Sequence, residues 1–132
     1  MHIDPAMIHP ELRRAASLIR LLWPSFTERK YRLLKKVTKK LQGQCRSRLN
    51  YAQITIDRPD GSPLRLCIYS SLNPLTNVPG LLWLHGGGYA LGTPEQDELL
   101  IQRFIDKSNC VVVAPDYRLS IDAPYPAALE DS

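Results

Sequence analysis

GLLWLHGGGY, residues 80–89, joins a short apolar run directly to a histidine and three consecutive glycines. The continuous apolar run is typical of a strand that is buried on both faces of a parallel sheet. Each glycine loses more backbone freedom on folding than any other residue, so three in succession indicate unusual backbone dihedrals or a close approach of another group. The stretch therefore predicts a buried strand that leads straight into a functional loop.

The chain after the glycines predicts a helix and then a second buried strand. Residues 95–107 have helical spacing, with Leu99, Leu100, Phe104 and Ile105 expected to face inward. Residues 110–114 (CVVVA) are continuously apolar and predict a strand, and a further helix is expected to begin within residues 123–132. Strand, helix and strand in this order predict a parallel unit of the α/β class.

The chain before the apolar strand predicts a hairpin and two helices. Residues 53–58 and 64–69 alternate in polarity around a turn at 59–62, which predicts an antiparallel hairpin. Residues 10–23 and 25–42 have helical spacing, with Ser25 and Glu28 at the spacing of a capping box and Gly43 as the stop signal. We expect residues 1–48 to form the helices and residues 49–132 to form the α/β part.

Composition restricts the class of protein further. The 132 residues suit one domain, and no apolar run approaches the roughly 18 residues that a membrane span needs. The N-terminus lacks the pattern of a signal peptide, and the cysteines Cys45, Cys67 and Cys110 form no close pair, which predicts a cytoplasmic protein. Residues 1–50 carry 12 Lys and Arg against 3 Asp and Glu, whereas residues 51–132 carry 5 against 10. The basic character belongs to the predicted helices.

The glycine loop has three candidate roles. It is expected just beyond the carboxyl end of a parallel strand, where open α/β sheets place their ligand sites. Neither of the common glycine-rich phosphate-binding patterns occurs in the sequence, and a plain turn rarely needs three glycines. The remaining role is to present backbone N–H groups to an oxyanion without a Cβ in the way.

Two segments carry a resemblance to a known family. LHGGGYALGT, residues 84–93, and VVVAPDYRLSIDAPYPAALED, residues 111–131, resemble the hormone-sensitive-lipase-like group of carboxylesterases, in which a His-Gly-Gly-Gly motif forms the oxyanion loop. The resemblance covers about residues 79–131, and the hairpin and helices before them fit the same layout. It implies an incomplete α/β-hydrolase fold, with an antiparallel lead-in hairpin and a parallel unit preceded by N-terminal cap helices.

The resemblance also implies a role for each candidate site residue. The N–H groups of Gly87 and Gly88 would face the oxyanion, Gly86 would allow the turn, and His85 would orient the loop through its side chain. Tyr89, Trp23 and Phe26 would line the substrate pocket, although packing roles are equally compatible with the sequence. The substrate implied is a small-molecule ester, and no metal or organic cofactor is implied.

The catalytic triad of such an enzyme is not found in these 132 residues. No serine has glycine at both the second position before it and the second position after it, and no histidine follows His85. We therefore expect the N-terminal part of a longer ester hydrolase, which ends before the nucleophile and is inactive alone. In that case one edge of the apolar strand would be unpaired, which predicts a marginally stable chain or a homo-oligomer.

Two other functions fit the sequence. The basic face of the second predicted helix could bind an anionic membrane or nucleic acid, but no accompanying nucleic-acid motif occurs, and solvation of a cap helix explains the charge more simply. Alternatively, the chain could be a catalytically inactive pseudoenzyme, or a subunit that is complemented by a separate C-terminal half.

Overall fold

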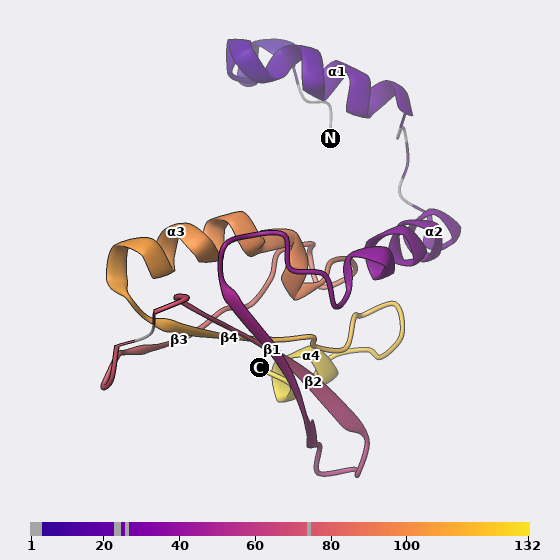
Figure 1. Cartoon of the computed structure of the whole chain (residues 1–132). Coiled ribbons are helices and arrows are strands. Elements are labelled where there is room, and N and C mark those ends of the chain that lie inside the picture. The colour runs from indigo at the N-terminus through magenta and orange to yellow at the C-terminus, as the bar shows by residue number, and fades with distance from the viewer. Residues whose placement is uncertain (1–3, 23–24, 26, 74) are drawn as a thin grey trace.

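The computed structural model describes residues 4–22, 25, 27–73 and 75–132. Four strands form one mixed sheet in the order β1-β2-β4-β3, and helix α3 lies along one face of it (Figure 1). The strands are β1 (Asn50–Asp57), β2 (Pro63–Ser70), β3 (Gly80–Leu82) and β4 (Val111–Pro115), and the helix is α3 (Glu98–Ser108). The chain therefore has the mixed α/β architecture expected from its sequence.

The register of the strands confirms both predicted pairings. β1 and β2 pair antiparallel from Asn50 opposite Ser70 to Asp57 opposite Pro63, which is the predicted hairpin. β3 and β4 pair in parallel, with Leu81 opposite Val112. β2 also pairs antiparallel with β4 and so joins the hairpin to the parallel pair in one sheet.

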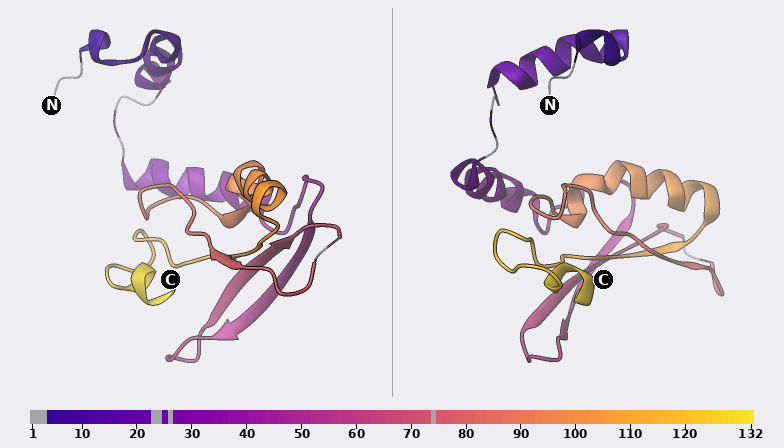
Figure 2. Two further views of the ribbon diagram at one scale, coloured as in Figure 1. Left: turned by 90° about the vertical axis from the view of Figure 1, so that its left-hand side faces the viewer. Right: turned by 180° about the vertical axis from the view of Figure 1, so that it is seen from behind.

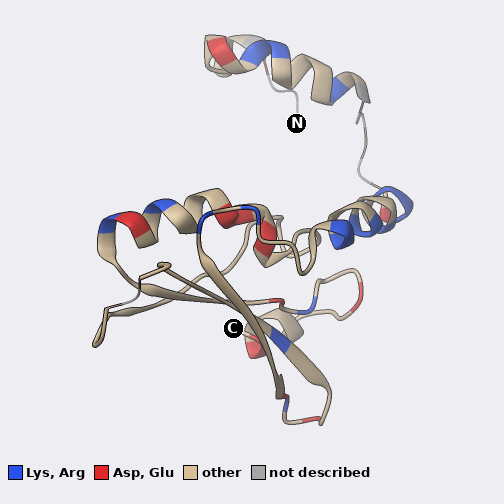
Figure 3. Ribbon diagram, viewed as in Figure 1, with Lys and Arg blue, Asp and Glu red and all other residues tan. Residues whose placement is uncertain are grey.

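The N-terminal segment is helical, as expected. It contains η1 (Pro5–Met7), η2 (Pro10–Leu12), α1 (Arg13–Leu22), α2 (Glu28–Thr38) and η3 (Lys39–Leu41). Helix α1 lies apart from the sheet, whereas α2 leads into the body of the protein (Figures 1 and 2). Lys and Arg residues are frequent in α1 and α2 (Figure 3).

The predicted start of the second helix was wrong. Thr27, not Ser25, is the N-cap of α2, and its side chain makes no capping hydrogen bond. The carboxylate of Glu28 instead accepts two hydrogen bonds from the guanidinium of Arg32, one turn further along the same helix. At the other end, Gly43 has a φ of +75°, as expected of a residue that ends a helical segment.

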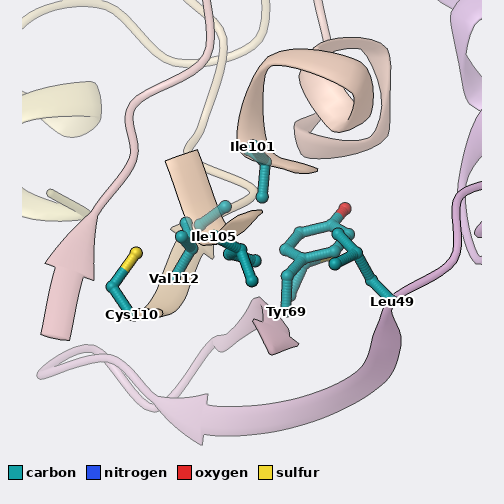
Figure 4. Packing of buried hydrophobic residues seen from close by; sticks show 8 residues of the cluster. Leu49, Tyr69, Ile101, Ile105, Cys110 and Val112 are labelled. Carbon is teal, nitrogen blue, oxygen red and sulfur yellow. The ribbon is translucent and has the colours of Figure 1, made fainter. Parts of the chain in front are cut away.

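The hydrophobic core lies between the sheet and α3 (Figure 4). Tyr69 of β2 and Val112 of β4 are fully buried beneath Ile101 and Ile105 of the helix. Of the four helix residues expected to face inward, only Ile105 does so, because the buried stripe follows Ile101 and Ile105 at a spacing of four residues. The other three lie on the outer arc and are 47–72% exposed: Leu99, Leu100 and Phe104.

The opposite face of the sheet is largely open in the part of the chain that the structure describes. Strand side chains alternate between faces, so Leu81 and Trp83 pack against the core while Leu82 and Leu84 are 54% and 48% exposed. The prediction that this strand is buried on both faces was therefore wrong. Near this open face the chain ends in the short helix α4 (Ala127–Glu130), at the position expected for a helix start.

Two further expectations concern cysteines and membranes. Cys67 and Cys110 are buried as small apolar side chains, whereas Cys45 is only half-buried, and all three are free thiols. No described helix combines the length and apolar character that crossing a bilayer requires.

Candidate oxyanion site

The glycine loop occupies the place predicted for it, at the carboxyl end of β3. The N–H of Trp83 donates to the carbonyl of Val113 at 2.9 Å, which extends the parallel pairing by one step beyond β3. The chain then leaves the sheet at His85 and continues through the short helix η4 (Pro94–Asp97) into α3. The loop from His85 to Gly92 therefore stands at the end of a sheet where α/β proteins bind ligands.

Glycine is required at two positions of this loop. Gly87 has a φ of +131°, and a Cβ on it would collide with the carbonyl of Leu91. Gly92 has a φ of +112°, and a Cβ on it would lie 2.5 Å from Nδ1 of His85. Gly86 has no positive φ and has free space where a Cβ would stand, so the prediction that Gly86 makes the turn was wrong. The turn is made at Gly87 and Gly88.

Three consecutive N–H groups of the loop, those of Gly87, Gly88 and Tyr89, are unpaired among the residues that the structure describes. Ala90 and Leu91 both donate to the carbonyl of Gly87, at 3.2 and 3.1 Å, which closes the turn. The N–H groups of Gly87 and Gly88 donate to no acceptor among the residues that the structure describes. Both glycines are exposed, so these donors are accessible to a ligand from solvent. Adjacent unpaired donors are what an oxyanion site needs.

His85 lies beneath the loop and is 3% exposed. Its Nδ1 donates to the carbonyl of Gly86 at 3.0 Å, and its ring stacks on Tyr117 with the centroids 4.1 Å apart. The Tyr117 hydroxyl in turn donates to the backbone carbonyl of His85 at 2.7 Å. Burial raises the pKa of Tyr117 to about 12, so this hydroxyl remains a donor at neutral pH. The side chain of His85 contacts the loop from below and does not reach solvent.

Tyr89 follows the glycines in a left-handed conformation, with a φ of +59°. Its carbonyl accepts the N–H of Ser120 at 2.7 Å, which holds the loop against the segment after β4. The side chain is 63% exposed and borders a mostly apolar pocket of about 500 Å³ beside Gly88. Leu84, Tyr125 and Leu129 also line this pocket. The other two predicted pocket residues, Trp23 and Phe26, lie outside the described residues.

A buried ionic network supports the segment that follows the loop. Glu95 of η4 accepts hydrogen bonds from Nη1 of Arg65 at 2.5 Å, the N–H of Gly43 at 2.8 Å and the hydroxyl of Tyr51 at 3.0 Å. Nη2 of Arg65 also binds Asp116 at 2.9 Å. Burial of the Glu95 carboxylate opposes its ionisation, but the donated hydrogen bonds outweigh that effect and lower its pKa to about 2. The carboxylate is therefore charged and fully paired.

Two residues beside the loop were not singled out by the sequence. Gln96 and Asp97 of η4 bind Gly86 from one side, whereas Tyr117 and Ser120, which lie in the segment that carries the family resemblance, bind the loop from the other. No spacing or motif marks the contacts of Gln96 and Asp97. Among the described residues, no group of three His, Cys, Asp or Glu side chains is placed to hold a metal ion.

Comparison with known proteins identifies the fold. Residues 81–132 match the family model described as the α/β-hydrolase fold. The chain thus carries part of an α/β-hydrolase fold, which confirms the predicted fold class and the resemblance to esterases of this fold. The matched region begins in β3 and contains the whole glycine loop.

Relatives in sequence and structure agree with that assignment. The chain is 36% identical over 83 residues to an AB hydrolase superfamily protein of Schizosaccharomyces pombe, a match that covers 59% of this chain and 24% of that protein. It is 33% identical over 86 residues to esterase LipI of Mycobacterium tuberculosis, covering 64% and 27%. The ester-hydrolase EH1AB1 from the metagenome of Lake Arreo superposes with a TM-score of 0.72 at 25% identity, covering 95% of this chain and 42% of that one. The chain spans about a quarter of the length of these sequence relatives.

Proposed function

We propose that this chain supplies the oxyanion site of a carboxylic ester hydrolase whose nucleophile, acid and base come from residues outside these 132. The observation that carries the proposal is the pair of unused N–H groups on Gly87 and Gly88 at the carboxyl end of β3. The similarity to proteins named as esterases supports an ester as the substrate class.

The proposed chemistry is acyl transfer to water in two steps. A serine oxygen attacks the ester carbonyl, whose oxygen becomes negatively charged as the tetrahedral intermediate forms. The N–H groups of Gly87 and Gly88 donate to that oxygen, and one such donor typically contributes about 3–4 kcal/mol to lowering the barrier. Collapse of the intermediate expels the alcohol, and water then attacks the acyl group in the same way. His85 orients the loop and does not transfer a proton.

The remaining predicted residues complete the proposed site. Tyr89 would form a wall of the substrate pocket, together with Trp23 and Phe26. Residues 1–48 would act as part of a cap over the pocket. The ion pair between Lys35 of α2 and Asp122 supports this role, because it holds the basic helix against the segment that follows β4. The residues that complete the site would come from a C-terminal half, either covalently joined or in a separate chain.

Two proteins test the proposal. The first is the 132-residue chain itself, and the second joins residues 1–132 to the C-terminal part of EH1AB1 that this chain does not match. With p-nitrophenyl acetate and butyrate, we expect no turnover from the first protein and saturable turnover from the second. Circular dichroism must show that the joined protein is folded. A folded joined protein without turnover would overturn the proposal. So would saturable turnover by the 132-residue chain that a serine-directed fluorophosphonate stops.

A matched pair of glycine variants isolates the oxyanion donors in the joined protein. Gly88 and Gly61 have φ values of +60° and +77°, and neither has any atom within 4 Å of an added Cβ. Gly61 lies in the hairpin turn, far from the loop along the chain. Substituting Ala at either position should therefore cost similar stability, but only Gly88→Ala should lower kcat/KM, by about ten-fold or more. If the two variants had equal kcat/KM, Gly88 would not be part of the oxyanion site.

A further inference from the structure

Two neighbouring side chains of η4 bind consecutive peptide groups of the glycine loop. Nε2 of Gln96 donates to the carbonyl of Gly86 at 2.8 Å. Oδ2 of Asp97 accepts the N–H of Gly86 at 3.4 Å. Gly86, which directly precedes Gly87 and Gly88, is thus held through both its N–H and its carbonyl.

The Asp97 contact is anchored through Trp83, which packs against the core. The same Oδ2 accepts the indole N–H of Trp83 at 2.9 Å, and the indole packs edge-on against Phe104 of α3 with the ring centroids 5.5 Å apart. At the other end of the His85–Gly86 peptide, the Tyr117 hydroxyl donates to the carbonyl of His85 at 2.7 Å. That peptide plane is therefore fixed from both sides by side chains that the core positions.

The Gln96 contact acts on the next peptide. The carbonyl of Gly86 and the N–H of Gly87 belong to one planar peptide group. A donor on the carbonyl oxygen polarises the group and makes its N–H a stronger donor, because hydrogen bonds in series reinforce one another. The Gly86 carbonyl receives two such donors, Nε2 of Gln96 and Nδ1 of His85.

We propose that Gln96 and Asp97 are positioning residues that aim and polarise the Gly87 N–H for the oxyanion. This inference rests on the proposed ester hydrolase function. Asp97 fixes the plane of the first peptide, and Gln96 fixes and polarises the second. Neither side chain contacts substrate, and each acts only through the backbone of Gly86.

Kinetics of the joined protein provide the first test. Gln96→Met keeps the length of the side chain and removes the donor, whereas Gln96→Lys keeps a donor at a similar reach. Gln102 of α3, for which the structure shows no hydrogen bond to the loop, provides the control Gln102→Met. We expect Gln96→Met to lower kcat about three- to ten-fold with KM unchanged, and Gln96→Lys to recover at least half of the loss. An unchanged kcat, or an effect on KM alone, would overturn the inference.

Nuclear magnetic resonance of the 132-residue chain provides a test that does not depend on activity. Gly87 and Gly88 are the only glycines preceded by glycine, so labelling glycine with ¹³C at the carbonyl and with ¹⁵N gives an HNCO spectrum with two signals. Gln96→Met should move the Gly87 amide proton upfield and leave the Gly88 signal in place. An unmoved Gly87 signal would overturn the inference even if the joined protein is active. If the joined protein is folded but inactive, the proposed function fails, and this spectrum alone decides the role of Gln96.

Discussion

Asp131 and Arg58 lie 73 residues apart in the sequence and form a two-point ion pair, with Oδ1 2.7 Å from Nε and Oδ2 3.0 Å from Nη2. The Asp131 carboxylate also accepts the backbone N–H and the guanidinium of Arg118. It is almost fully buried. One carboxylate therefore ties together the hairpin, the segment after β4 and the end of α4.

Asp131→Asn should strongly destabilise the fold. The substitution keeps the shape of the side chain but leaves Arg58 and Arg118 without their shared counter-charge. Removing one partner of a buried ion pair costs about 3 kcal/mol in the free energy of unfolding. Urea unfolding measures the change. The control is Glu130→Gln at the neighbouring, exposed carboxylate, which should cost less than about 1 kcal/mol. Equal losses for the two variants would contradict the role given to Asp131.

Acid should unfold the protein through Asp131 and Glu95. Burial opposes ionisation of both carboxylates, but hydrogen bonds from Arg58 and Arg118 to Asp131, and from Arg65 to Glu95, lower each pKa to about 2. A carboxylate with a lowered pKa stabilises the folded state above its ordinary pKa, and that contribution is lost as the pH falls towards 2. For Asp131 the loss is about 2 kcal/mol.

The Asp131→Asn variant also tests the pH dependence. The wild type should lose stability between about pH 4 and pH 2, and its unfolding midpoint should approach that of Asp131→Asn at the acid end, because a protonated carboxyl and an amide are both neutral. Thermal unfolding followed by circular dichroism at half-unit pH steps measures both curves. Parallel curves over the whole range would show that Asp131 is not the group that titrates.

Gly87→Ala should disrupt the loop, whereas Gly86→Ala should not. The added methyl at Gly87 collides with the carbonyl of Leu91, and the φ of +131° is unfavourable for alanine. At Gly86 the methyl meets nothing within 4 Å. In the free energy of unfolding, we expect a loss of at least about 1–3 kcal/mol for Gly87→Ala and a change within about 0.5 kcal/mol for Gly86→Ala. Urea unfolding of both proteins provides the comparison, and similar values would mean that the turn is not made at Gly87.

Tyr89 is expected to carry backbone strain. The left-handed conformation costs a non-glycine residue roughly 1–2 kcal/mol of conformational free energy, whereas glycine adopts it without this cost. Tyr89→Gly should therefore be about 1 kcal/mol more stable than Tyr89→Ala. Asn109, which ends α3 with a φ of +47°, allows the same comparison away from the site. If Tyr89→Ala equals or exceeds Tyr89→Gly in stability while the Asn109 pair shows the expected order, Tyr89 is not strained.

The free edge of β3 should make the 132-residue chain self-associate. β3 pairs with β4 on one side and with no described strand on the other, and Leu82 and Leu84 are exposed beside this edge. Light scattering after size-exclusion chromatography should show a mass that rises with concentration. Leu84→Lys should lower that mass, whereas the control Leu75→Lys, at an exposed loop position, should not. A monomer whose melting is sharp, reversible and independent of concentration would refute the prediction.

Local patterns in the sequence were sufficient to predict much of the fold. The hairpin, the parallel strand pair and the place of the glycine loop followed from alternation, apolar runs and turn residues. The buried stripe of α3 was misassigned, because Leu99, Leu100 and Phe104 are as apolar as Ile101, and only the position of the sheet decides which arc is covered. The prediction that β3 is buried on both faces failed for the same reason, since an apolar run does not show which face has a partner.

The sequence by itself determined that a glycine-rich loop follows an apolar strand, because three consecutive glycines indicate a backbone with unusual dihedrals or a close approach of another group. Tertiary structure alone decided how that loop is held. Two ionic clusters each bring together three segments that are distant in the sequence: Arg65 with Glu95 and Asp116, and Asp131 with Arg58 and Arg118. In addition, the side chain of Gln96 binds the carbonyl of Gly86, ten residues earlier in the chain. The physical reason is that dihedral preferences are local to a residue, whereas charge pairing and hydrogen bonding between side chains depend on distances that exist only after the sheet has formed.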